Sequence, residues 1–265
     1  MIVIEAKKKY YTKKELKEWI RRMKKKNINW AQWGGWFDSD GSFSNAIKKS
    51  KNNRPYRSRR VALKLKDKDP VEFFAKQFET TLHYYESNTK TPNGNTYRAK
   101  SYEAILIGPR AVWFSKKIKK YILQKTDYLR KIFEGTSIVY EPYKQSFTKE
   151  EMTAYLATLI EGDGVYGNRK LHPKRCYFSI SSIQFHFLNY LKKETLRLGI
   201  TNFGDIYKNL WQSKGTPRKN ILYRIEFKGN MLEAEKSLLQ LLPYMTMDRK
   251  IKKVSETLNW INQRK

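Results

Sequence analysis

Apolar and polar positions along this chain follow helical and strand periods, and the two kinds of pattern alternate in the same order twice. Residues 12–26 place apolar side chains on one face of a basic helix. Residues 59–67 read as a half-buried strand, with Val61, Leu63 and Leu65 on one face and Arg60, Lys64 and Lys66 on the other. The order α-β-β-α-β-β-α is predicted for residues 1–134 (the first half) and again for residues 148–265 (the second half). Residues 135–147 have no such period and contain Gly, Pro and Ser, which predicts a linker. We therefore expect an α+β protein of two similar halves.

Periodicity and turn residues predict the other elements. In the first half we expect helices over residues 29–40, 70–82 and 109–119, and another apolar periodic stretch over 121–133. Strands are expected over residues 42–49 and in two runs within 84–107. In the second half we expect helices over residues 148–163, 185–198, 230–242 and 247–262. Strands are expected there over residues 165–171, 176–182, 203–210 and 221–228.

One short pattern occurs twice, at the end of one predicted helix in each half. Residues 30–43 read WAQWGGWFDSDGSF, and residues 153–166 read TAYLATLIEGDGVY. Both copies pass from small and apolar residues to acid-x-Asp-Gly and an aromatic residue, and Asp163 follows Asp40 by 123 positions (163 − 40). Both also carry the spacing of an N-cap with its capping-box partner and a glycine suited to a left-handed C-cap: Asn29 with Gln32, Thr148 with Glu151, Gly41 and Gly164.

The repeated acids are expected at helix C-termini, where a carboxylate is electrostatically unfavourable. The macrodipole is negative there and the last carbonyls lack partners, so a hard cation such as Mg²⁺ would compensate both. Stripes of small residues would let the two helices pack closely: Ala31, Gly34, Gly35, Ala154, Ala157 and Thr158. Asp40 and Asp163 would then lie side by side, and their repulsion favours a bound metal ion. The alternative, a plain helix-to-strand turn at each Asp-Gly, is disfavoured because two matching copies occur.

The two motifs WGGWFDSDG (33–41) and LATLIEGDG (156–164) resemble the pair of LAGLIDADG motifs in a single-chain homing endonuclease. The second matches closely, and the first has Trp33, Trp36 and Phe37 where Leu or Ile is usual. The resemblance implies two antiparallel sheets that form a saddle over DNA, with the motif helices packed at the interface. It implies that Asp40 and Asp163 bind the divalent metal ion used to cut DNA.

The resemblance also implies polar and basic residues near these acids. The family places a water-ordering residue after the second strand of each half, which implies Asp67 and Ser182, with Gln184 close enough to compete. A basic residue at the end of the fourth strand implies Lys228 in the second half. The corresponding position in the first half is Gly108, with Arg110 two residues later as a candidate substitute. The alternatives are plain turn formers and a surface lysine.

Base reading is expected from the outward residues of the strands. The candidates are Ser44, Ala46, Lys48, Lys64, Lys66, Arg169, Arg175, Tyr177 and Ser179. Lysines on such a surface can contact phosphates only, which positions a protein without specifying a sequence. Because the halves differ at nearly all of these positions, we expect an asymmetric DNA site.

Charge restricts the class of partner. The 265 residues contain 55 Lys and Arg against 25 Asp and Glu, for a formal net charge of +30, which predicts a polyanionic partner. No apolar run reaches the ~18 residues of a membrane span, so nucleic acid is favoured over lipid.

A single cysteine, Cys176, and three histidines exclude disulfides and Cys/His zinc sites within one chain. The N-terminal residues lack a signal-peptide pattern, so an intracellular protein is expected. Abundant Lys, Asn, Ile and Tyr would also suit an organelle, a mitochondrion or chloroplast, with an AT-rich genome.

Three functions remain open at this stage. The first is a monomeric, intron-encoded, magnesium-dependent endonuclease that makes a staggered cut in double-stranded DNA at a long asymmetric site. Mn²⁺ is expected to replace Mg²⁺, and Ca²⁺ to support binding with little cleavage. The second is an intron maturase that binds intron RNA, and the third is a DNA-binding protein that has lost catalysis.

Overall fold

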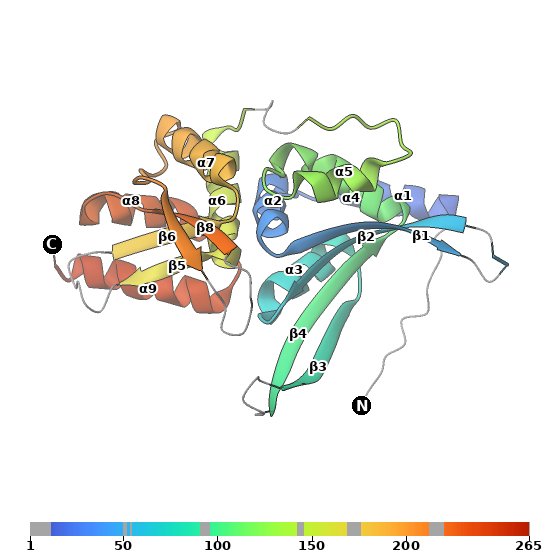
Figure 1. Ribbon diagram of the computed structural model, residues 1–265, viewed down its shortest axis with the longest axis horizontal. Helices are drawn as coiled ribbons and strands as arrows, with labels where there is room; N and C mark the ends of the chain where they lie inside the picture. The colour runs from blue at the N-terminus through green and yellow to red at the C-terminus, as the bar shows by residue number, and fades with distance from the viewer. Residues whose placement is uncertain are drawn as a thin grey trace.

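The computed structural model describes residues 12–49, 52–53, 55–90, 96–141, 146–168, 176–211 and 220–264. The elements follow the predicted order in both halves (Figure 1). The first half contains α1 (Lys13–Lys25), α2 (Trp30–Ser39), β1 (Gly41–Lys49), β2 (Pro55–Leu65), α3 (Lys68–Phe78), β3 (Leu82–Lys90), β4 (Thr96–Ile107), α4 (Pro109–Ile118), η1 (Lys119–Tyr121) and α5 (Thr126–Phe133). The second half contains α6 (Lys149–Asp163), β5 (Gly164–Asn168), β6 (Cys176–Ser182), α7 (Phe185–Arg197), β7 (Tyr207–Trp211), β8 (Asn220–Glu226), α8 (Met231–Leu241), η2 (Leu242–Tyr244) and α9 (Asp248–Asn262).

Each half has one four-stranded antiparallel sheet, and the two sheets share a topology. The strand orders are β1-β2-β4-β3 and β5-β6-β8-β7. Helices cover one face of each sheet, and in β2 the apolar side chains of Val61 and Leu63 are buried on that face while Lys64 is exposed on the other. The α+β prediction and the alternation of this strand are therefore confirmed.

Both predicted N-caps form, but the capping box is complete only at Thr148, because the Gln32 side chain donates to the Tyr244 carbonyl instead. The Asn29 side chain accepts a hydrogen bond from the Gln32 amide, and Thr148 and Glu151 form a complete capping box. Such caps contribute about 1 kcal/mol each. The start points of both motif helices are thus fixed by local sequence.

The expectation of left-handed C-caps at Gly41 and Gly164 is wrong. Among the described residues, positive φ angles at glycine occur only at positions 108, 135 and 199. Instead, a Cβ at Gly41 would lie 2.3 Å from a Phe37 ring atom, and one at Gly164 would lie 2.5 Å from Ile160. Glycine is needed because the chain turns back closely over its own helix as the strand begins.

The core of the first half is aromatic. The rings of Phe37, Phe74 and Phe78 lie 4.9–5.5 Å from that of Phe114, centroid to centroid, and Trp33 packs edge-on against Phe74 at 5.1 Å. Pairs of this kind contribute about 0.5–1.5 kcal/mol beyond burial. The tryptophan that departs from the usual motif therefore fills space between α2 and α3.

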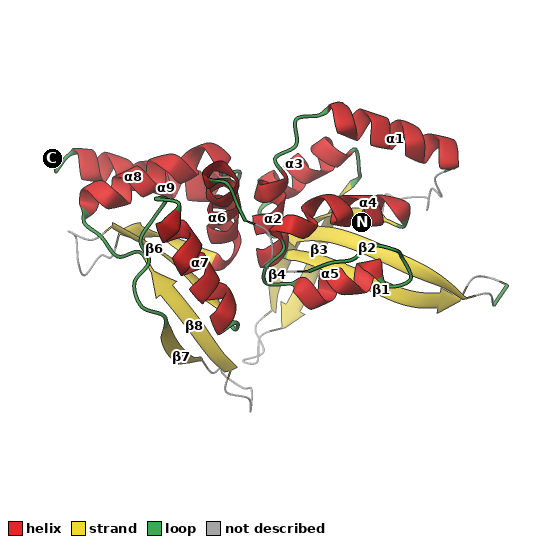
Figure 2. Ribbon diagram, turned by 90° about the horizontal axis from the view of Figure 1, so that it is seen from above, coloured by secondary structure: helices red, strands yellow, loops and turns green. Residues whose placement is uncertain are grey.

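The motif helices α2 and α6 pack against each other at the centre of the molecule (Figure 2). A Cβ at Gly35 would lie 2.2 Å from the Tyr155 carbonyl oxygen, so the backbones are in close contact. The Thr158 hydroxyl donates to the Gln32 carbonyl at 2.7 Å across this contact. Gly34, which is expected in the same stripe of small residues, faces Tyr121 of η1 instead of α6.

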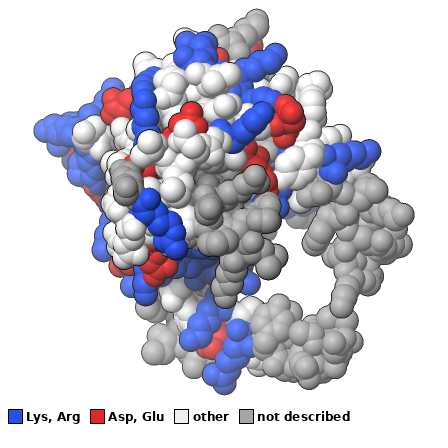
Figure 3. Space-filling view, turned by 90° about the vertical axis from the view of Figure 1, so that its left-hand side faces the viewer, with Lys and Arg blue, Asp and Glu red and all other residues white. Residues whose placement is uncertain are grey.

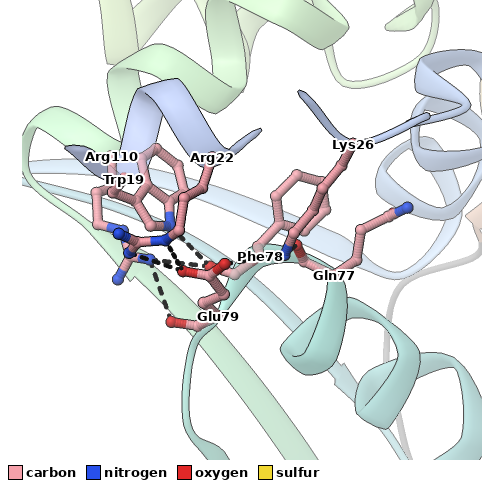
Figure 4. Close-up of polar contacts among 7 residues, drawn as sticks. All are labelled: Trp19, Arg22, Lys26, Gln77, Phe78, Glu79 and Arg110. Atoms are coloured by element: carbon pink, nitrogen blue, oxygen red, sulfur yellow. Dashed lines mark hydrogen bonds and ion pairs between the residues drawn. The ribbon is translucent and has the colours of Figure 1, made fainter. Parts of the chain in front are cut away.

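Helix α1 is attached to the end of α3 (Figure 4). The Trp19 indole donates to the Phe78 carbonyl at 3.1 Å, and the Lys26 ammonium donates to the Gln77 carbonyl at 2.7 Å. Arg22 and Lys26 also pair with Glu79, whose φ of +51° ends α3. These donors satisfy carbonyls that a helix C-terminus otherwise leaves open.

Candidate active site

Asp40 and Asp163 come together at the ends of the two motif helices. Asp40 is the C-cap of α2 and Asp163 is the last residue of α6. A Cβ at Gly162 would lie 2.5 Å from Oδ2 of Asp40, so the end of α6 touches the carboxylate of α2. Burial, and then the charge of Asp40, raise the pKa of Asp163 to about 6. The expected side-by-side placement of two repelling acids is present.

The first acid of each motif has a different, structural environment. Asp38 is fully buried and accepts hydrogen bonds from the Leu123 amide at 2.6 Å, the Lys125 amide at 2.9 Å and the Tyr155 hydroxyl at 2.7 Å. These bonds keep residues 123–125 out of a helix, which is why the single periodic stretch expected over 121–133 is interrupted between η1 and α5. The carboxylate therefore sets the path of the segment that reaches the site.

Glu161 plays the same part in the second half. Its carboxylate accepts from the Thr246 amide at 2.8 Å and the Met247 amide at 2.7 Å, immediately before α9. Burial raises the pKa of Glu161 to about 7, although these bonds oppose the shift. In each motif, the first acid thus positions the segment before a later helix, α5 or α9. The last acid of each motif lies at the interface between the motif helices.

Each positioned segment delivers one lysine to the end of a motif helix. The Lys125 ammonium donates to the carbonyls of Ser39 and Gly41, both at 2.6 Å. The Lys250 ammonium donates to the Gly164 carbonyl at 2.7 Å. Burial lowers the pKa of both lysines, that of Lys250 to about 8. Ammonium groups therefore pair with backbone carbonyls where each motif helix gives way to a strand.

Sequence reasoning missed these lysines. Lys125 directly precedes α5, whereas Lys250 lies inside the first turn of α9, so the two do not share a local pattern. The spacing from the motif glycine also differs between the halves, 84 residues from Gly41 to Lys125 and 86 residues from Gly164 to Lys250. In a chain with 55 basic residues, neither pattern nor spacing singles these two lysines out.

The two final acids fit a divalent cation. Mg²⁺ is commonly held by one or two carboxylates, with water and substrate phosphate as further ligands. A cation between Asp40 and Asp163 would remove the repulsion that raises the pKa of Asp163. Within the described ranges no three His, Cys, Asp or Glu residues gather as a metal cage, so any remaining ligands would be water, phosphate or backbone oxygen.

The predicted water-ordering residues, Asp67 and Ser182, both lie near this pair of acids. The charge of Asp67 contributes to raising the pKa of Asp40, after the larger effect of burial. Ser182 donates to Oε1 of Gln124 at 2.8 Å, and Nε2 of Gln124 donates to the Asp38 carbonyl at 3.2 Å. Gln184, the competing residue, instead donates through its side chain to the Gln124 carbonyl at 2.9 Å. Their role in ordering water stays a prediction.

Lys228 is not brought to the acids. The register pairs Tyr223 with Ser182 and Glu226 with Ser179, so β8 runs away from the Asp163 end of the sheet before it reaches Lys228. The Lys228 side chain is exposed, and its backbone amide bonds to Asn202. A catalytic role for Lys228 does not fit this geometry.

Arg110 is likewise a structural residue. It is 3% exposed, donates to the carbonyls of Phe78 and Glu79, and stacks over Trp19 with 4.1 Å between its guanidinium carbon and the ring centroid (Figure 4). Gly108 before it is the N-cap of α4, with φ of +57°. Arg110 therefore does not replace a missing lysine. In the first half, the lysine that contacts the end of the motif helix is Lys125.

The predicted base-reading residues of the first half lie on the open face of its sheet. Those exposed there or just beyond β2 are Ser44, Ala46, Lys48, Lys64 and Lys66. In the second half Ser179 is only 2% exposed, because Arg224 lies over it and donates to its hydroxyl at 3.0 Å. Arg169, Arg175 and the Tyr177 side chain lie outside the described residues.

Basic residues are also spread over surfaces remote from the acids. Figure 3 shows the side of the second half turned away from the first, where Lys and Arg are interspersed with Asp and Glu. None of the described helices is both long and apolar enough to cross a membrane.

Comparison with known proteins identifies the fold. No protein-family model and no curated protein sequence matches the chain. Solved structures that are similar to it include the following three. The I-LtrWI LAGLIDADG homing endonuclease bound to target DNA has 17% identity and a TM-score of 0.52, over 90% of this chain and 91% of its own. The LAGLIDADG meganuclease I-AabMI bound to uncleaved DNA has 12% identity and a TM-score of 0.53, over 89% and 91%. The homing endonuclease I-WcaI bound to its DNA recognition sequence has 15% identity and a TM-score of 0.52, over 92% and 95%. The chain has the fold of the LAGLIDADG homing endonucleases.

Proposed function

We propose that this protein is a site-specific endonuclease that hydrolyses double-stranded DNA with a divalent metal ion. The observation that carries the proposal is the convergence of Asp40 and Asp163, one from each half, with a buried lysine beside each. We call the residues around Asp40 and those around Asp163 the two half-sites of the active site. Two acids from related half-sites suit the cutting of two strands at one place. The similar structures named above, which are bound to DNA, support the same substrate class.

The chain's own residues would divide the chemistry among them. Asp40 and Asp163 would hold the metal ion, which supplies an activated water and stabilises charge on the phosphate. Lys125 and Lys250 place positive charge where the phosphate gains negative charge. With a pKa of about 8, Lys250 can hold a proton on Nζ near neutral pH and release it to the departing oxygen. Mg²⁺ is the expected ion, with a staggered cut by a monomer.

The open sheet faces provide the surface for a duplex. The residues exposed on the first sheet combine lysines with small polar side chains, which suits both phosphate contact and groove reading. The net charge of +30 favours a polyanion. Since the two halves present different residues, the target site is asymmetric.

The structure bears on one alternative. The apparent absence of a basic residue at Gly108 was the reason to consider a DNA-binding protein without catalysis. Lys125 supports the nuclease over this alternative, because it brings a basic group to the end of the motif helix in that half. Cleavage of any DNA with Mg²⁺ would rule out the inactive DNA-binding protein. An intron maturase is the second alternative, and folded intron RNA competing effectively with duplex DNA would favour it.

The decisive experiment selects cut sites from a randomised duplex library with Mg²⁺, and then with Ca²⁺ in its place. We expect staggered cleavage at one long asymmetric site with Mg²⁺, and binding with little cleavage in Ca²⁺. Asp40→Asn and Asp163→Asn should retain binding and lose cutting. Retention of a site without cutting in either metal would contradict the proposal.

A further inference from the structure

The residue before each active-site lysine reaches across to the other half. Arg249, before Lys250, donates to Asp67 of the first half through Nε at 2.7 Å and Nη2 at 3.0 Å. Gln124, before Lys125, accepts from Ser182 of the second half at 2.8 Å. The two crossings are geometrically related but chemically different.

The crossing at Asp67 is a charged, two-point contact. Asp67 is the N-cap residue of α3, yet its side chain makes no capping bond, because the carboxylate is turned to Arg249. The planar guanidinium holds both carboxylate oxygens, which fixes the orientation of the group. Gly41 pairs with Leu63 in the sheet, so Asp67, just beyond the end of β2, lies at the Asp40 end and its fixed carboxylate borders that half-site.

The crossing at Ser182 is neutral. Its hydroxyl donates to the Gln124 amide oxygen, and the Gln124 amide nitrogen donates to the Asp38 carbonyl at 3.2 Å. Gly164 pairs with Ile180 in the sheet, so Ser182, two residues further along β6, lies at the Asp163 end. The Asp163 half-site therefore depends on a hydroxyl and an amide where the Asp40 half-site depends on an ion pair. Groups that orient a metal site in this way commonly change activity about 10- to 100-fold when altered.

We propose that Arg249 is a positioning residue that acts through Asp67 at the Asp40 half-site alone, so that the two DNA strands are cut by chemically unequal half-sites. The inference rests on the proposed function. Arg249 holds the Asp67 carboxylate at the Asp40 end of the first sheet, and Gln124 holds the Ser182 hydroxyl at the Asp163 end of the second. Replacing either residue slows the cutting of one strand more than the other.

The test measures the cutting rate of each strand separately, on the selected target duplex with a different label on each strand. The variants are Arg249→Lys, which keeps the charge but loses the two-point contact, Asp67→Asn, the double variant, and Gln124→Ala. The matched control is Arg197→Lys, because Arg197 makes the same kind of two-point contact with Glu194 on the surface of α7.

We expect Arg249→Lys and Asp67→Asn each to slow one strand at least about tenfold, with the other strand within about twofold. The double variant should be no slower than the slower single, and Gln124→Ala should slow the opposite strand. A purely structural role would slow both strands alike, because both acids share one interface, and that result would overturn the inference. Additive slowing, or slowing of the same strand by Gln124→Ala, would also overturn it. If the unaltered protein cuts no site at all, the proposed function itself has failed.

Discussion

Replacing Gly35 with alanine tests whether close packing of the motif helices is required. A Cβ there would lie 2.2 Å from the Tyr155 carbonyl oxygen and 2.3 Å from the Thr158 hydroxyl oxygen, where ordinary contact begins at 3.4 Å. Because two of the nearest atoms belong to backbone, α2 and α6 must separate locally by about 1 Å. Such overpacking costs about 1–3 kcal/mol.

Two further terms enter the balance for Gly35→Ala. Separation weakens the bond from Thr158 to the Gln32 carbonyl, which costs about 1 kcal/mol, while alanine gains about 1 kcal/mol in helix propensity. The net loss is therefore about 1–3 kcal/mol. At about 2–4 °C per kcal/mol for a chain of this size, the Tm should fall by roughly 5 °C.

The same displacement should act on catalysis. Asp40 and Asp163 lie at the ends of these helices, and a misplacement of about 1 Å can cost about 10²-fold in rate. The assay pairs thermal unfolding with the cutting rate on the selected site. The control is Gly204→Ala, because a Cβ there meets no atom closer than 3.6 Å. A Gly35→Ala protein with unchanged Tm and cutting rate would refute the requirement for close packing.

Three other predictions concern charges at and away from the site. Lys125→Met and Lys250→Met should each lower the cutting rate at least about 10²-fold while DNA binding in Ca²⁺ changes little, since each removes a positive charge beside the reacting phosphate; equal losses of binding and cutting would point to a binding role instead. Asp38→Asn should reduce the free energy of unfolding by about 2–4 kcal/mol in urea, because an amide NH₂ would face buried backbone N–H donors; an unchanged midpoint would contradict its structural role. Burial disfavours ionisation of Glu79, but hydrogen bonds from Arg22 and Lys26 outweigh it and hold the pKa of Glu79 below its ordinary value of 4.5. The ionised carboxylate therefore contributes stability above pH 4.5, and this contribution is lost as the pH falls through the lowered value. The difference in unfolding free energy between the unaltered protein and Glu79→Gln should shrink between pH 6 and pH 3, and a constant difference would refute the ion pair.

Local sequence determined those features of the protein that depend on neighbours within one helical turn or one strand. The caps at Asn29 and Thr148 and the alternation of β2 follow from side chains a few residues apart, so periodicity was sufficient to predict them. The repetition of one motif then predicted that Asp40 and Asp163 would meet. Two copies of a helix with small residues on one face have an obvious way to pack.

Tertiary structure alone decided which basic residues accompany the acids. Lys125 and Lys250 are placed by the buried carboxylates of Asp38 and Glu161, through hydrogen bonds that span 85 to 87 residues of sequence. A local period does not reveal such a contact, and composition does not distinguish these two lysines among the chain's 55 basic residues. Arg110 instead donates to the carbonyls at the end of α3, because the last carbonyls of a helix have no partner within the helix. The sequence thus determined the acids by repetition, and the fold selected their partners by proximity.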